Sequence, residues 1–116
     1  MKTIGIVGSR RRNTLQDRTL VHQKFREIYT DGDHIVSGGC PQGADNFAES
    51  IAKSDQVPIT IHYAKWHKHG RAAGFIRNGD IAAQANVLIA CVAPDRTGGT
   101  EDSIKKFGTE GEVYLV

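Results

Sequence analysis

Short apolar runs recur along the chain, and their length and composition are typical of β-strands. Five such runs cover residues 3–7, 35–37, 58–63, 87–93 and 112–116. The run at 87–93 is apolar at every position, as expected of an interior strand with both faces buried. The run at 58–63 begins with Pro58, which favours a place nearer the edge of a sheet.

The segments between these runs carry apolar residues at helical spacing. Val21, Phe25 and Ile28 share one face of a predicted helix over residues 14–30. Similar spacing predicts further helices over residues 44–54, 72–85 and 103–107. Because strands and helices alternate, the chain predicts an α/β fold, an open parallel five-stranded sheet with helices on both faces. We expect residues 1–116 to form a single domain.

A glycine-rich turn follows three of the predicted strands. The turns are Gly8-Ser9-Arg10, the segment from Gly38 to Asp45, and Gly98-Gly99-Thr100. Glycine lets backbone approach a ligand closely, and a helix that begins behind such a turn directs unpaired N–H groups toward it. The carboxyl ends of parallel strands meet at one edge of a sheet. The three turns therefore predict one crevice for a phosphate-bearing, nucleotide-like ligand.

The segment from Lys65 to Arg71 follows the third predicted strand and reaches the same edge. Ser9, in the first turn, suits either a hydrogen bond to phosphate or one within its own turn. Other side chains expected around the crevice are Arg10, Asp45, Trp66, Arg77 and Thr100.

Three of these residues have a structural interpretation beside the functional one. Asp45 suits the cap of the second helix as well as contact with a ribose hydroxyl. Trp66 suits stacking on a purine, but equally anchoring of its loop in the core or a dimer contact. Arg77 suits contact with phosphate or ribose, or a surface salt bridge to Asp80 or Asp33.

Composition and charge narrow the possible functions. The net charge is only +2, but Lys and Arg concentrate in residues 1–30, where a basic lip would attract an anion. No apolar stretch is long enough to span a membrane and no signal peptide precedes the first strand, so we expect a cytoplasmic protein. Cys40 and Cys91 form no CxxC pair and are expected to be reduced. His67 and His69 lack a third ligand, so no metal site is expected.

Four stretches of the chain, in order, carry a resemblance to a known family. They are Val36-Ser37-Gly38-Gly39 through Asp45, Ala64-Lys65-Trp66, Ala72 to Asn78, and Gly99-Thr100. With these motifs the chain closely resembles the small SLOG-superfamily proteins of the YspA type over nearly its whole length. That superfamily has a Rossmann-like fold. It includes the cytokinin-activating LOG phosphoribohydrolases, the DNA-processing protein A family and predicted sensors of nucleotide-derived signals.

The resemblance implies a nucleotide or ADP-ribose-like ligand. Arg77 takes the place of an arginine that precedes the fourth strand in LOG enzymes, which implies a ligand-binding or catalytic role. With the turns included, the expected ligand-binding residues are Gly8, Ser9, Arg10, Gly38, Gly39, Gly43, Ala44, Asp45, Trp66, Arg77, Asn78, Gly98, Gly99 and Thr100.

LOG enzymes carry the pattern PGGxGTxxE, whose glutamate assists cleavage of the N-glycosidic bond. In the corresponding stretch of this chain Ser103 replaces that glutamate, and the carboxylates are Glu101 and Asp102. Serine carries no charge to stabilise the oxocarbenium-like state of this reaction. On a helix Glu101 would face about 200° away from position 103, and Asp102 about 100° away. If the chain is a hydrolase, the candidate catalytic residues are Arg77, Glu101 and Asp102.

These features predict a binding protein that captures a nucleotide or nucleotide-derived signal, ADP-ribose-like or a cyclic nucleotide. It would act as a sensor, a carrier or a sequestering protein, and its size would suit a phage or mobile element. A phosphoribohydrolase or other N-glycosidase acting on a nucleoside monophosphate is the alternative. A single-stranded nucleic-acid binder is a weaker one, because the near-neutral charge and single tryptophan argue against nucleic acid.

No cofactor is expected for this chain. Relatives in the resembled family commonly form dimers, so a homodimer or higher homo-oligomer is expected. The alanine-rich segment 72–85 would pack closely either against a symmetry mate or against its own sheet.

Overall fold

The computed structural model describes residues 1–116 and contains a five-stranded sheet in which every strand pair is parallel. The strand order is β3-β2-β1-β4-β5, which places β4 in the interior and β3 at an edge, as predicted. This arrangement confirms the predicted α/β fold class. The strands are β1 (Thr3–Gly8), β2 (His34–Ser37), β3 (Ile59–Ile61), β4 (Val87–Cys91) and β5 (Val113–Leu115).

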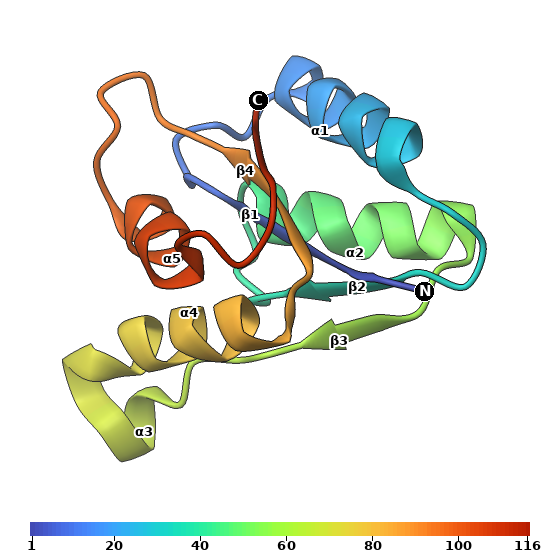
Figure 1. Cartoon of the computed structure of the whole chain (residues 1–116). Helices are drawn as coiled ribbons and strands as arrows, with labels where there is room; N and C mark the ends of the chain where they lie inside the picture. Colours follow the sequence, from blue (N-terminus) through green and yellow to red (C-terminus); the bar gives the residue numbers. More distant parts are fainter.

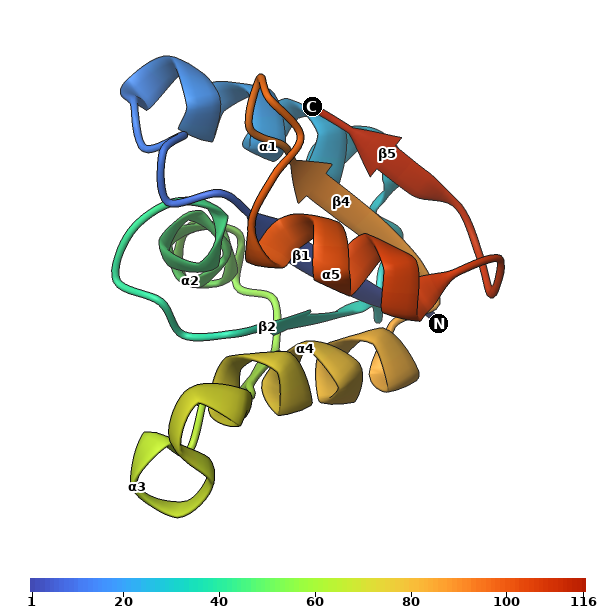
Figure 2. The same ribbon diagram turned by 90° about the vertical axis from the view of Figure 1, so that its left-hand side faces the viewer.

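Helices cover both faces of the sheet. On one face lie α1 and α2, and on the other lie α4 and α5 (Figure 1 and Figure 2). The short helix α3 and the 3₁₀ turn η1 join β3 to α4. The helices are α1 (Leu15–Ile28), α2 (Ala44–Asp55), α3 (Trp66–His69), η1 (Gly70–Ala72), α4 (Ala73–Gln84) and α5 (Gly99–Phe107).

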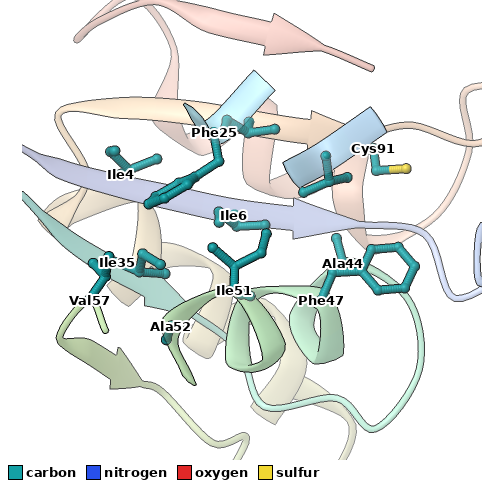
Figure 3. Close-up of a cluster of buried hydrophobic side chains, with 13 residues drawn as sticks. Ile4, Ile6, Phe25, Ile35, Ala44, Phe47, Ile51, Ala52, Val57 and Cys91 are labelled. Carbon is teal, nitrogen blue, oxygen red and sulfur yellow. The ribbon is translucent and has the colours of Figure 1, made fainter. Parts of the chain in front are cut away.

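Each face of the sheet has its own apolar core, because successive residues of a strand point to opposite sides. In β4, Ile89 and Cys91 belong to the core under α1 and α2, and Leu88 and Ala90 belong to the core under α4 and α5. All four side chains are fully buried. Figure 3 shows the first of these cores, where side chains of α1 and α2 meet those of β1. The alanine-rich helix α4 packs Ile81 and Ala82 against its own sheet.

Two helical segments differ from the predictions. Residues 66–72 form α3 and η1, neither of which was predicted, and α4 itself begins at Ala73. The last helix begins at Gly99 and not at residue 103. Its N-cap is Gly98, which offers no side-chain cap hydrogen bond, so the sequence carries no capping signal there. All other predicted bounds agree within two residues.

The two cysteines are both free thiols. Cys91 is fully buried in β4, and this burial raises the pKa of its thiol. A thiol of this kind is a poor nucleophile. None of the helices combines the length and the apolar character that crossing a bilayer requires.

Asp33 joins the chain start to the loop before β2, at the amino end of the sheet. Its buried carboxylate accepts hydrogen bonds from the Lys2 amide (2.8 Å), the Lys2 Nζ (2.5 Å) and the Thr30 amide (2.9 Å). Burial alone would raise the pKa of Asp33, but these hydrogen bonds outweigh it and hold the pKa well below its ordinary value.

We expect Asp33→Asn to lower the free energy of unfolding at pH 7 by about 2 kcal/mol. Because the folded-state pKa is depressed, the stabilisation is complete above the unfolded pKa near 4 and is lost as pH falls below it. Urea unfolding at pH 7 and near pH 3 measures both points. The difference in free energy of unfolding between the wild type and Asp33→Asn should be smaller near pH 3 than at pH 7. An equal difference at the two pH values would contradict this explanation.

Candidate functional site

The sheet changes its direction of winding between β1 and β4. From β1 the chain continues through β2 to β3, whereas β4 and β5 lie on the other side of β1. In open α/β sheets a crevice opens beyond the carboxyl ends of the strands at such a point. A cavity of about 290 Å³ lies here, and its lining residues are Val7, Gly8, Ser9, Arg10, Arg11, Asp45, Arg77, Asn78, Ile81, Thr97, Gly98, Gly99, Thr100 and Ser103.

Most of the residues expected to bind ligand line this cavity. They come from the loop after β1, the start of α2, the helix α4 and the start of α5. These predicted residues are Gly8, Ser9, Arg10, Asp45, Arg77, Asn78, Gly98, Gly99 and Thr100. The structure thus brings them together, and their contact with a ligand stays a prediction.

Of the glycine-rich second turn, only its last residue, Asp45, lines the cavity. A Cβ on Gly43 would lie 2.7 Å from the Ser9 carbonyl oxygen, so this turn packs directly against the first one. The side chain of Ala44 is fully buried against Gly8. Four residues of this turn that were predicted to touch the ligand lie outside the lining: Gly38, Gly39, Gly43 and Ala44.

The start of α5 presents free backbone donors to the cavity. Gly98 has a φ of +105°, a left-handed conformation that favours glycine, and it turns the chain into the helix. The amides of Gly99 and Thr100 donate to no backbone carbonyl and to no side chain. The positive end of the helix dipole adds to the attraction of these amides for an anion.

Arg77 reaches the cavity from α4. Its Nη1 donates to the Gly38 carbonyl (2.7 Å) and its Nε donates to the Asn78 Oδ1 (3.1 Å). Its Nη1 also lies 4.0 Å from the Asp45 Oδ2. The alternative interpretation, a surface salt bridge with Asp80 or Asp33, does not form, and Asp33 is instead bonded to Lys2 at the amino end of the sheet. The remaining nitrogen, Nη2, has no partner in the chain and is available to a ligand.

Asp45 supplies a buried carboxylate to the cavity wall. It does not cap α2, whose N-cap is Gly43. Instead it accepts hydrogen bonds from the Ser37 hydroxyl (3.0 Å) and the Cys40 amide (3.1 Å). Burial raises the pKa of Asp45, although the Cys40 amide and the charge of Arg77 oppose the shift.

Two further arginines lie at the first turn. Arg11 forms a bidentate pair with Asp95 (2.7 and 2.8 Å) and also donates to the Thr97 hydroxyl (2.9 Å). These bonds hold the loop before α5 beside the first turn. Arg10 is exposed at the cavity and has no carboxylate partner, so its guanidinium is free to meet an anion.

Neither of the carboxylates expected of a hydrolase lines the cavity, although Asp102 accepts a hydrogen bond from the lining residue Asn78 (3.1 Å). Glu101 pairs with Arg96 (2.8 Å), and Asp102 pairs with Lys106 (2.9 Å). Ser103 lines the cavity at the position of the LOG glutamate. Asp45 is the only carboxyl group in the lining.

Sequence reasoning missed several lining residues. Arg11, Thr97 and Ser103 all face the cavity, and none was predicted to bind ligand. The position of Ser103 within the PGGxGTxxE pattern was the one signal that pointed to it. The exposed ion pair of Arg11 with Asp95 links residues far apart in the sequence, so no local pattern predicts it.

Trp66 lies outside the cavity, as does the rest of the segment from Lys65 to Arg71, which was expected to meet the other loops there. Trp66 begins α3, its side chain is 56% exposed, and its ring lies against Gly74. The neighbouring His67 and His69 join no group of three side chains that could hold a metal ion.

The fold is similar to those of two solved structures. DNA processing protein A from Helicobacter pylori has a TM-score of 0.76 and 17% sequence identity, covering 98% of this chain and 64% of that one. The molybdenum cofactor binding protein from the phototrophic bacterium Rippkaea orientalis has a TM-score of 0.76 and 22% identity, covering 98% of this chain and 75% of that one. No protein-family model and no curated protein matches the sequence. The likeness shows a shared Rossmann-like fold, and this chain spans less than two thirds of the DNA processing protein A chain.

Proposed function

We propose that the cavity between β1 and α5 binds a phosphate-bearing ligand of the nucleotide type. One observation carries the proposal: a single small cavity combines free helix amides, free guanidinium nitrogens and one buried carboxylate. Its lining holds Arg10, Arg11 and Arg77 against the single acid Asp45. This excess of positive charge suits an anion.

The parts of the cavity suit different parts of such a ligand. The amides of Gly99 and Thr100 would bind a phosphate group, with the guanidinium of Arg77 or Arg10 donating to the same oxygens. Asp45 would repel a phosphate, so it suits a ribose hydroxyl, which can donate to a carboxylate. Because no aromatic side chain lines the cavity, the base would not be stacked there.

We further propose a nucleotide-derived signal as the ligand, ADP-ribose-like or cyclic, which the chain would sense, carry or sequester. We also propose that residues 1–116 form one domain, as their length implies, and that the chain forms a homo-oligomer, as the resembled family implies. The two structural neighbours are described as proteins that bind single-stranded DNA and a molybdenum cofactor. Binding of DNA by one of them weakens the expectation that nucleic acid is not a partner.

A phosphoribohydrolase is the second candidate. Its support is the combination of Arg77 and Asp45 on one cavity wall, since a carboxyl group with a raised pKa can donate a proton to a leaving base. Glu101 and Asp102 speak against it, because neither carboxylate lines the cavity and each is paired with a cation. We therefore favour binding over cleavage.

Ligand binding should raise the melting temperature by mass action. At one hundred times Kd, a ligand stabilises by about 2.7 kcal/mol, which raises Tm by roughly 10 °C for a chain of this size. We expect such a shift with AMP, ADP-ribose or a cyclic nucleotide, and none with adenosine. An equal shift with adenosine would show that phosphate is not recognised, and no shift with any compound would contradict the proposal.

Release of free base separates the two candidate functions. Purified chain incubated with nucleoside monophosphates should leave them intact, as judged by chromatography of the products. Base release that disappears in Asp45→Asn, while the variant keeps its melting temperature, would instead establish the hydrolase.

A further inference from the structure

A basic and aromatic segment lies at one corner of the molecule, away from the sheet. It comprises residues 63–71 between β3 and α4, and we call it the arm. Both views show its helix α3 at one corner of the molecule, away from the sheet (Figure 1 and Figure 2). No residue of the arm lines the ligand cavity, so a function of the arm is separate from that of the cavity.

The arm lies in a part of the chain that has no negative charge. Between Asp55 and Asp80 there is no carboxylate side chain. Within the arm, Lys65, Lys68 and Arg71 are all exposed, and none of them forms an ion pair. Such unpaired cations form a surface that attracts a polyanion.

Two aromatic side chains lie among these cations. Tyr63 is 63% exposed and Trp66 is 56% exposed. Each ring is backed by a glycine: a Cβ on Gly39 would lie 2.6 Å from the Tyr63 ring, and one on Gly74 would lie 3.3 Å from the Trp66 ring. The backbone therefore supports each ring from one side while much of the side chain stays open to solvent.

We propose that the arm binds single-stranded nucleic acid, with bases stacked on Tyr63 and Trp66 and phosphates paired with the three arm cations. Open aromatic rings interleaved with cations are what binding of unpaired strands requires, because every base has a flat face and every linkage a charge. A duplex keeps its base faces stacked and would meet only the cations. An acidic protein would pair with the cations but would have no base to stack on the exposed aromatic rings.

Trp66 is the only tryptophan, so its fluorescence reports directly on the arm. An oligodeoxythymidine should quench its emission on binding. The log of the affinity should fall against the log of salt concentration with a slope of about −2, since each paired phosphate of a single strand contributes about 0.7. Trp66→Ala, followed with a labelled oligonucleotide, should weaken binding about tenfold, whereas Trp66→Phe should retain most of it.

Matched variants distinguish a specific surface from general charge attraction. Lys68→Gln should reduce the salt slope by about 0.7, and Lys53→Gln, the same change on exposed α2, should leave it unchanged. Trp66→Ala should also keep the thermal shift given by AMP, because the cavity lies elsewhere.

Three outcomes would overturn the proposal. The first is an affinity for the oligonucleotide that Trp66→Ala does not change. The second is an equal loss of slope in Lys53→Gln, which would show that net charge alone acts. The third is a change in Trp66 emission with vesicles containing phosphatidylserine but not with the oligonucleotide, which would assign the arm to membranes.

Discussion

Arg77→Ala should weaken binding of a phosphate-bearing nucleotide at least 100-fold, which corresponds to about 2.7 kcal/mol. The Arg77 side chain is largely buried, and Gly38, Asn78 and Asp45 contact its Nη1 and Nε. These contacts hold the free Nη2 in place before the ligand arrives. A preorganised, partly desolvated guanidinium forms strong hydrogen bonds with phosphate oxygens. Titration calorimetry with AMP at constant ionic strength measures the loss.

Two controls accompany this variant. Arg77→Lys keeps the charge but loses the planar fork, so its affinity should fall between that of the wild type and that of Arg77→Ala. The Gly38 carbonyl loses its donor in Arg77→Ala, so the free energy of unfolding should fall by about 1 kcal/mol. Normal affinity in a folded Arg77→Ala would restrict this side chain to a structural role.

Phe107→Ala should lower the free energy of unfolding by about 3–5 kcal/mol. Phe107 is fully buried in the core under α4 and α5. Its helix has only two other buried residues, Thr100 and Ser103, and both are polar and line the cavity. Loss of the phenyl ring should therefore loosen α5 and weaken AMP binding about tenfold in the protein that remains folded. Urea unfolding and calorimetry measure the two effects.

Phe25→Ala is the matched control on the opposite face of the sheet. Phe25 is 1% exposed and packs in the core under α1 and α2, so the variant should lose similar stability. Its cavity should stay intact, because no residue of α1 lines it. Equal losses of AMP affinity in both variants would show that global stability, and not the seating of α5, governs binding.

The sheet could be predicted from the sequence because its signals are local. The apolar run at 87–93 gave the interior strand, and Pro58 indicated the edge strand; both positions are confirmed. The rim of the sheet was also predictable, since parallel strands all bring their carboxyl ends to one edge. Arg77 and Asp45 were expected at this rim, and both line the cavity.

Features that depend on contacts between distant residues were not predictable. In the second turn, residues 38–44 lie outside the cavity lining, and Gly43 packs on the Ser9 carbonyl, a contact across the fold that no pattern in the sequence encodes. The helix α5 begins at Gly99 without a capping side chain, so its true start escaped prediction. The helices α3 and η1 were not predicted either, because they are too short to carry a periodic signal.

The first and last residues differ in how close an added tag would lie to the ligand cavity. The chain start lies at the amino end of the sheet, where Lys2 is bonded to Asp33 (Figure 1), and neither Met1 nor Lys2 lines the ligand cavity. The final residue, Val116, lies at the opposite end, and its carbonyl accepts a hydrogen bond from Arg12 (2.6 Å), beside the loop that leads into the cavity. An affinity tag or an immobilising linker therefore belongs on Met1. The same addition after Val116 would lie beside Arg12 and the first turn, whose residues Gly8, Ser9 and Arg10 line the cavity.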